Sequence, residues 1–140
     1  MKIIILTFAF IFSLFACSHK MNPDKYKKSQ IIFGSGGGFT NLVNEYHLLE
    51  NGRLYHKKST DTVFTELGKQ NSDSVKILFN KTKVLFAETK GFREPGNMYY
   101  FIKFKHDSTT NEIVWGASKE TLPAKVKDLY KELMNLVHLK

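Results

Sequence analysis

The stretch from Met98 to Lys105 limits the fold of this chain more than any other, because its side chains alternate regularly. In an extended strand, alternate side chains lie on opposite faces of the sheet. The side chains on one face would be Tyr100, Ile102 and Phe104, and those on the other Tyr99, Phe101 and Lys103. A turn over residues 107–111 and a return strand from Glu112 to Trp115 complete a predicted hairpin.

Two segments have the apolar spacing of helices with one buried face. In the first, Asn71 or Ser72 can cap the N-terminus. In the second, Thr121 is the predicted cap, and Pro123 is tolerated in the first turn. The buried stripes are Val75, Leu78, Phe79, Leu85 and Phe86 in the first helix, and Val126, Leu129, Tyr130, Leu133, Leu136 and Val137 in the second.

Short extended runs precede the first helix. The predicted strands are Gln30–Phe33, Leu42–Leu49, Leu54–Lys58 and Val63–Leu67. Asn51 and Gly52 predict a type I′ turn between the second and third of these strands, because both residues accept positive φ. If that turn holds two residues, Leu49 faces Leu54 and His47 faces His56, whereas a longer loop changes the register.

The order of elements is therefore strands, helix, hairpin, helix. Consecutive hairpins favour an antiparallel sheet, and helices with one apolar face need a surface to cover. We predict an α+β domain with an antiparallel sheet of about five to six strands and both amphipathic helices packed on one face. Tyr99, Phe101 and Trp115 cannot all share the face of Tyr100 and Phe104. Some aromatic surface is therefore expected on a partly open second face, unless the N-terminal segment or a loop covers it.

The first seventeen residues have the features of an export signal. A positive start is followed by a thirteen-residue apolar run, Ile3 to Phe15. The run spans roughly 20 Å, less than the ~30 Å hydrocarbon core, which favours a signal peptide over a transmembrane helix. Its end, Leu14-Phe15-Ala16-Cys17, resembles the lipobox of bacterial lipoproteins, although Phe15 is larger than usual there. The resemblance implies that Cys17 is lipidated and starts the mature chain. An ordinary signal peptide or an N-terminal helix is the alternative.

This interpretation divides the chain into three parts. Residues 1–16 would be the signal peptide, residues 17–29 the lipidated Cys and a flexible tether, and residues 30–140 a single α+β domain. Ser18, rather than Asp, follows the lipidated residue, which in well-studied lipoprotein systems accompanies transfer to the outer membrane. The expected location is thus the bacterial cell envelope, anchored in the outer membrane and facing the periplasm.

Charge and cysteine content exclude several functional classes. The net charge is +8, from 21 Lys and Arg against 13 Asp and Glu. An exported, anchored protein seldom meets nucleic acid, so we predict that this charge meets anionic head groups or an acidic partner. Cys17 is the only Cys. An intramolecular disulfide is therefore excluded and, once Cys17 is lipidated, so are a thiol nucleophile and Cys-ligated zinc.

The run Gly34-Ser35-Gly36-Gly37-Gly38 is predicted to end the first strand. Clustered glycines mark positive φ or the close approach of a neighbouring segment. The run lacks the Lys and Ser or Thr of a Walker loop, and it is not followed by a helix as in a dinucleotide-binding motif. A structural turn or bulge, a protein-binding loop and an anion site remain as alternatives. The candidate binding residues are Gly36, Gly37, Gly38 and Phe39.

Neither a metal centre nor a catalytic site is indicated by the sequence. His47 and His56 would begin a metal site if they faced each other, but a third ligand at suitable spacing is missing. The sequence contains no Gly-x-Ser-x-Gly elbow and no His-Glu-x-x-His motif. We therefore predict that the protein is not an enzyme and uses no cofactor and no metal.

Several stretches together resemble the emfourin family, small bacterial proteins associated with inhibition of thermolysin-like metalloproteases. The stretches are Ser35 to Phe39 after a first strand, a capped helix ending near Phe86, Pro95-Gly96-Asn97-Met98-Tyr99-Tyr100, and Leu122-Pro123 before an amphipathic last helix. The likeness spans about residues 30–137. Asn41, in place of another Gly, the export leader and the Asn51-Gly52 hairpin depart from the family pattern. The resemblance implies protein binding, with Gly37, Gly38 and Phe39 as the first contact residues.

The sequence thus favours a lipid-anchored, non-enzymatic protein-binding module of the cell envelope, with protease inhibition of the emfourin type as its specific form. The alternative is an envelope lipoprotein that binds a small ligand or a lipid, which requires an interior cavity between sheet and helices. An unrecognised hydrolase is a third hypothesis, and it would place converging polar side chains near the glycine run.

The lipidation hypothesis predicts the behaviour of Cys17→Ser. This variant should lose palmitate labelling and leave the membrane fraction, because each acyl CH₂ buried in the bilayer contributes about 0.8 kcal/mol to membrane binding. Palmitate labelling of growing cells, followed by fractionation, measures both effects. Unchanged membrane partitioning of the variant would contradict lipidation at Cys17.

Overall fold

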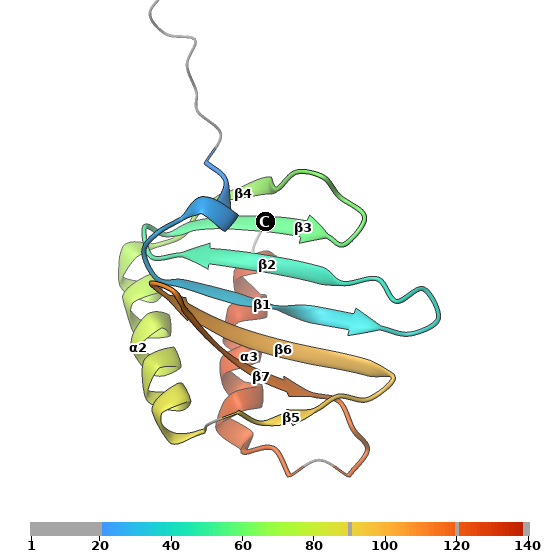
Figure 1. The fold of residues 1–140 in the computed structure, drawn as a ribbon. Helices are drawn as coiled ribbons and strands as arrows, with labels where there is room; N and C mark the ends of the chain where they lie inside the picture. Colours follow the sequence, from blue (N-terminus) through green and yellow to red (C-terminus); the bar gives the residue numbers. More distant parts are fainter. Residues whose placement is uncertain (1–20, 90, 120, 139–140) are drawn as a thin grey trace, which may run out of the picture.

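A seven-stranded sheet forms the centre of the fold, in the order β4-β3-β2-β1-β6-β7-β5 (Figure 1). The computed structural model describes residues 21–89, 91–119 and 121–138. Neighbouring strands are antiparallel, except that β5 runs parallel to β7. The strands are β1 Gln30–Gly37, β2 Asn44–Leu49, β3 Arg53–Lys58, β4 Thr65–Lys69, β5 Arg93–Glu94, β6 Met98–His106 and β7 Thr109–Trp115.

Two helices, α2 (Ser72–Glu88) and α3 (Ala124–His138), lie on the same side of this sheet (Figure 1). The predicted cap of α2 is confirmed, because Asn71 Oδ1 accepts from the backbone N–H groups of residues 73 and 74 at 2.9 and 3.1 Å. The predicted start of α3 is wrong. The helix begins at Ala124, and Val126 N–H donates to Pro123 O at 3.0 Å. The residue that precedes the first turn is therefore Pro123 and not Thr121.

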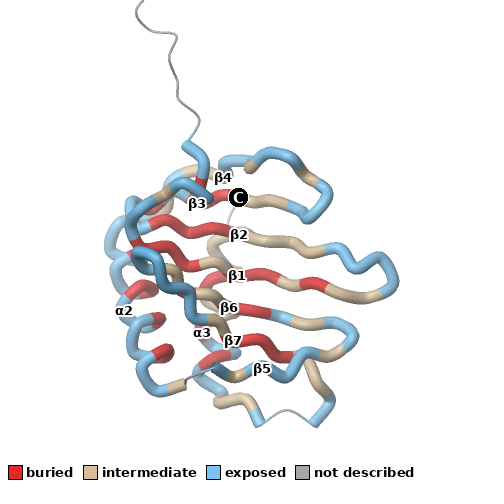
Figure 2. The backbone as a smooth tube through the Cα atoms, in the orientation of Figure 1, coloured by how far each residue is buried: buried red, intermediate tan, exposed pale blue. Residues whose placement is uncertain are grey.

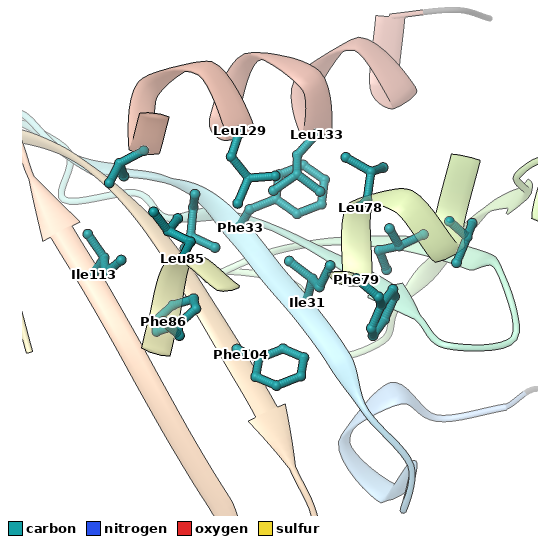
Figure 3. Packing of buried hydrophobic residues seen from close by; sticks show 14 of the residues in the cluster. Ile31, Phe33, Leu78, Phe79, Leu85, Phe86, Phe104, Ile113, Leu129 and Leu133 are labelled. Carbon is teal, nitrogen blue, oxygen red and sulfur yellow. The ribbon is translucent and has the colours of Figure 1, made fainter. Parts of the chain in front are cut away.

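Apolar side chains from both helices and from the near face of the sheet form one core (Figure 3). Ile31 and Phe33 of β1 point toward the helices, and Leu129 and Leu133 of α3 meet them. Figure 2 shows the buried positions in the middle strands and on the inner sides of the helices. Each fully buried aliphatic or aromatic side chain contributes about 1.5–3 kcal/mol to folding. The predicted α+β class and element order are confirmed.

The sheet has one strand more than the largest number predicted. The additional strand, β5, lies between α2 and β6, where the sequence predicted no strand. It has only two residues, too few for an alternating pattern, and it pairs with the outer edge of β7. β2 begins two residues later than predicted, and both ends of β4 are shifted by two residues. The turn predicted over residues 107–111 is too long, because β7 begins at Thr109, where it pairs with His106.

The prediction that the glycine run ends the first strand is wrong, because β1 continues through Gly37. The glycines instead allow the neighbouring strands to approach β1 closely. A Cβ on Gly34 would lie 1.9 Å from Asn44 O of β2, and one on Gly36 would lie 2.5 Å from the Tyr99 hydroxyl of β6. From the helix side, the Tyr130 hydroxyl donates to Gly34 O at 3.2 Å, and burial raises the pKa of Tyr130 to about 12.

The hairpin of β2 and β3 is confirmed in position but has a longer turn than the two-residue type. Leu48 pairs with Leu54, and His47 with Tyr55. Gly52 has a φ of 87° and donates its N–H to Leu49 O at 2.8 Å. These features fit a three-residue loop that ends on a left-handed glycine. The longer loop shifts the register by one residue, so His47 does not face His56.

Part of the segment predicted to be a flexible tether lies on the sheet. Pro23 begins a short 3-10 helix, η2 (Pro23–Lys25), and is buried. The Gln30 side-chain amide donates to Pro23 O at 3.3 Å, and the Glu50 N–H donates to Ser29 O at 3.1 Å. The packed part of the chain therefore begins before residue 30, because Gln30 and the start of β1 offer hydrogen bonds to the preceding backbone.

The close approach at Gly34 predicts a large cost for adding one methyl group there. Gly34→Ala should lower the free energy of unfolding by about 3 kcal/mol or more, because backbone of β2 must move to admit the Cβ. Gly91→Ala is the control, since a Cβ there meets nothing within 4 Å although φ is +63°. It should cost only about 1–2 kcal/mol. Urea denaturation compares the variants, and equal costs would contradict this account.

Candidate functional site

The sheet face opposite the helices carries an open concavity of about 770 Å³. Its rim is made by the loop between β1 and β2, the loop between β3 and β4, and residues 95–97. Side chains of the central strands form its floor, among them Glu45, Lys57, Tyr99, Phe101 and Lys103. This is the face that the sequence predicted to be partly open.

The glycines of β1 shape the floor of the concavity. Phe101 pairs with Gly34 across the two strands, and its Cζ atom would lie 3.0 Å from a Cβ on Gly34. Phe101 is only 2% exposed although it lies on the open face. Tyr99 lies in the same way beside Gly36. The missing side chains of β1 thus make room for aromatic rings of β6.

The predicted aromatic surface of the open face is therefore smaller than the sequence alone implies. Tyr99 and Phe101 do lie there, but Phe101 is covered by its neighbours. Trp115 lies on the helix side, stacked on Tyr100 at 5.8 Å between ring centroids.

A chain of hydrogen bonds links this face to the N-terminal segment. His47 is 2% exposed and lies between Gln30 Oε1, 3.0 Å from Nδ1, and Glu45 Oε1, 2.6 Å from Nε2. The amide nitrogen of Gln30 faces Pro23 O, which can only accept, so Gln30 Oε1 must face His47. Both ring nitrogens of His47 therefore face oxygen acceptors, the amide of Gln30 and the carboxylate of Glu45.

Glu45 is surrounded by positive charge. Lys103 Nζ lies 3.9 Å from its Oε2, and Lys57 pairs with Glu45 across β2 and β3. The hydrogen bond from His47, together with the charges of His47, Lys103 and Lys57, holds the pKa of Glu45 below its ordinary value, although burial acts in the opposite direction. Glu45 is thus ionised at neutral pH.

The predicted binding residues lie at the rim of this concavity and in the adjoining strand. Gly36 and Gly37 belong to β1, and Gly36 is buried beneath Tyr99. Gly38 follows the strand and donates its N–H to Asn97 O at 2.8 Å. Phe39 is completely exposed, at 107% of its reference area. Of the four, Phe39 therefore offers by far the largest free surface.

Sequence reasoning missed Glu45, Lys57 and Lys103 as site residues. They come from three strands, and only the register of the sheet brings them together. One signal for a charged site was visible in the sequence. Lys103 shares its predicted strand face with Tyr99 and Phe101, which places a cation beside two aromatic rings.

His47 and His56, which were considered as metal ligands, lie on opposite faces of the sheet. His47 lies on the open face, whereas His56 stacks on Tyr46 toward the helix side, at 4.7 Å between ring centroids. Within residues 21–89, 91–119 and 121–138, no group of three His, Cys, Asp or Glu side chains is arranged to hold a metal ion.

Two further observations concern surfaces outside the concavity. An apolar groove runs between α2 and α3, bordered by the ion pairs of Lys81 with Glu132 and of Lys125 with Glu88. Among the described residues, no helix has the length and apolar character needed to cross a bilayer. Cys17 and the predicted signal peptide lie outside the described residues.

No protein-family model matches the chain, and a search of curated proteins found no match.

The Glu45–His47 pair predicts a stability that depends on pH. Glu45→Gln should lower the free energy of unfolding at pH 7 by about 1.5–3 kcal/mol, the value of a hydrogen bond to a charged group. Because folding lowers the pKa of Glu45 from 4.5, its contribution is present above that pH and is lost as pH falls through the folded-state value. Urea denaturation between neutral and acid pH should show wild type and variant converging.

Glu132→Gln provides the matched control for this experiment. Glu132 forms an exposed ion pair with Lys81 at 2.7 Å on the helix side. Exposed pairs contribute about 1 kcal/mol or less. An effect of Glu45→Gln as small as that of the control, or one independent of pH, would contradict the proposed pairing.

Proposed function

We propose that this protein is a lipid-anchored, non-enzymatic protein-binding module of the bacterial cell envelope. The observation that carries the proposal is the exposure of Phe39 at the tip of the loop between β1 and β2. A fully exposed aromatic ring leaves a large apolar area in water, and such residues are typical anchors of protein interfaces. Gly37 and Gly38, with φ of 96° and 74°, hold the loop that carries the ring.

The position of the anchor supports a protein partner for Phe39. Asn51 Nδ2 lies 3.9 Å from Met21 Sδ, so the N-terminal segment leaves the fold near the turn between β2 and β3. From Met21 to Cys17 the chain can extend about 14 Å at most. Phe39 lies beyond the other end of β2, whose six residues span about 20 Å. The lipid therefore holds one end of the sheet near the membrane, and the loop of Phe39 belongs to the opposite end.

Inhibition of a thermolysin-like protease is the specific form of this proposal. It follows from the resemblance to the emfourin family. Two stretches of that resemblance, residues 35–39 and 95–100, are neighbours in space, since Gly37 pairs with Met98 and Gly38 donates to Asn97 O. Together they form one edge of the concavity, beside Phe39.

The other hypotheses have less support. A small-ligand or lipid carrier needs space between sheet and helices, but large side chains of the core fill that layer in the described part of the chain (Figure 3). For a hydrolase, Ser35 is the hydroxyl residue of the glycine run. Its place in β1 puts it on the helix side, opposite to the face of His47.

A photo-crosslinking amino acid at position 39 tests the proposal in intact cells. It should form discrete adducts with a protein, whereas the same amino acid at position 77 should not. Ile77 is the control because it is an apolar residue on α2 that is 54% exposed. A metalloprotease in the adduct, identified by mass spectrometry, would support the inhibitor form. A different protein in the adduct would contradict the inhibitor form and identify another partner. Adducts only with lipid, or equal adducts at both positions, would contradict protein binding through Phe39.

A further inference from the structure

The charges on the open face point to the chemistry of the partner. Register places two rows of side chains across the central strands. One row contains Lys57, Glu45 and Phe101, and the next contains His47, Lys103 and Glu112. Lys57, His47 and Lys103 all act on the single carboxylate of Glu45. Two lysines and a histidine thus share one internal anion.

The other carboxylates of the concavity are already engaged. Glu112 forms an ion pair with Arg93, which is another cation of this surface. Asp61 Oδ2 accepts the backbone N–H of Lys58 at 2.8 Å and so belongs to its own turn. Among the described residues, neither carboxylate forms an ion pair with Lys57 or Lys103.

Both lysines are held in place by aromatic rings. Lys103 Nζ lies 4.9 Å from the centroid of the Phe101 ring, and Lys57 Nζ lies 4.8 Å from that of Phe64. A ring on one side removes water from an ammonium group and limits its rotamers. A carboxylate that approaches from solvent would meet two ammonium groups that have already lost part of their hydration and freedom.

We infer that the concave face binds an acidic side chain of a partner polypeptide, with its carboxylate between Lys57 and Lys103 beside Glu45. This inference rests on the proposed function and specifies the partner's chemistry. The concavity is open and continuous with the rim residues Gly37 and Gly38, which lead to Phe39. One partner segment can therefore place an apolar group against Phe39 and an acidic group on the lysines.

The test uses the mature lipoprotein in nanodiscs of zwitterionic lipid. Its probe is a short extended peptide of alternating Asp and Thr, and the same peptide with Asn in place of Asp is the comparison. NMR titration should show shifts of the amides of Glu45, Lys57 and Phe101 with the Asp peptide only. The affinity should fall as salt is added, because exposed charges are screened.

Two double variants distinguish peptide binding at this site from nonspecific attraction to a basic protein. Lys57→Gln with Lys103→Gln should weaken binding of the Asp peptide about tenfold, the size expected for loss of charge-assisted contacts. Lys76→Gln with Lys83→Gln removes the same charge from exposed positions on α2 and should change the affinity less than about twofold. Both double variants keep the core, and their NMR spectra report whether they fold.

Three results would overturn the inference. They are equal binding of the Asp and Asn peptides, equal loss in the two double variants, and absence of shifts on the open face at millimolar peptide. Binding of anionic vesicles that depends on Lys57 and Lys103, without peptide binding, would instead assign the surface to a membrane. If crosslinking at position 39 succeeds while the peptide fails, the proposed function stands and this inference alone falls. If the peptide binds while crosslinking fails, the role of Phe39 is wrong.

Discussion

The close packing of β1 against its neighbours is the constraint on which the rest of this structure depends. Gly34 and Gly36 present no side chain to the open face, so Asn44 O approaches from β2 and the rings of Phe101 and Tyr99 come in from β6. The same strand presents Ile31 and Phe33 to the helices. One strand therefore builds the core with its near face and the floor of the concavity with its far face.

Hydrogen bonds, in addition to packing, connect the N-terminal segment to the open face of the sheet. Pro23 O, Gln30, His47 and Glu45 form a continuous chain from the N-terminal segment to the middle of the open face. Burial of His47 removes water as an alternative partner, so each member needs the next one to satisfy its polar atoms. The segment that leads to the proposed lipid anchor is thereby coupled to the charge of the surface that we propose for binding.

The two proposals describe one arrangement of the molecule. A lipid on Cys17 would hold the end of the sheet near Asn51, and Phe39 belongs to the other end. The lysines beside Glu45 lie between these ends, on the face that the helices leave free. An acidic segment with one apolar residue would match this surface, and the high positive charge of the chain would favour its approach.

Local periodicity determined the class of this fold: alternation at Met98–Lys105 and the helical spacing after Asn71 are properties of neighbouring residues, and they correctly predicted a sheet covered by two helices. The sequence also contains the lipobox-like leader and the exposed Phe39, whose roles remain predictions. Tertiary structure alone decided the meaning of the glycine run and the identity of the charged site. Close approach at Gly34 depends on β2 and β6, and the meeting of Glu45, Lys57 and Lys103 depends on strand register. A loop one residue longer set the register of β2 and β3, and so placed Lys57 opposite Glu45 and moved His56 away from His47.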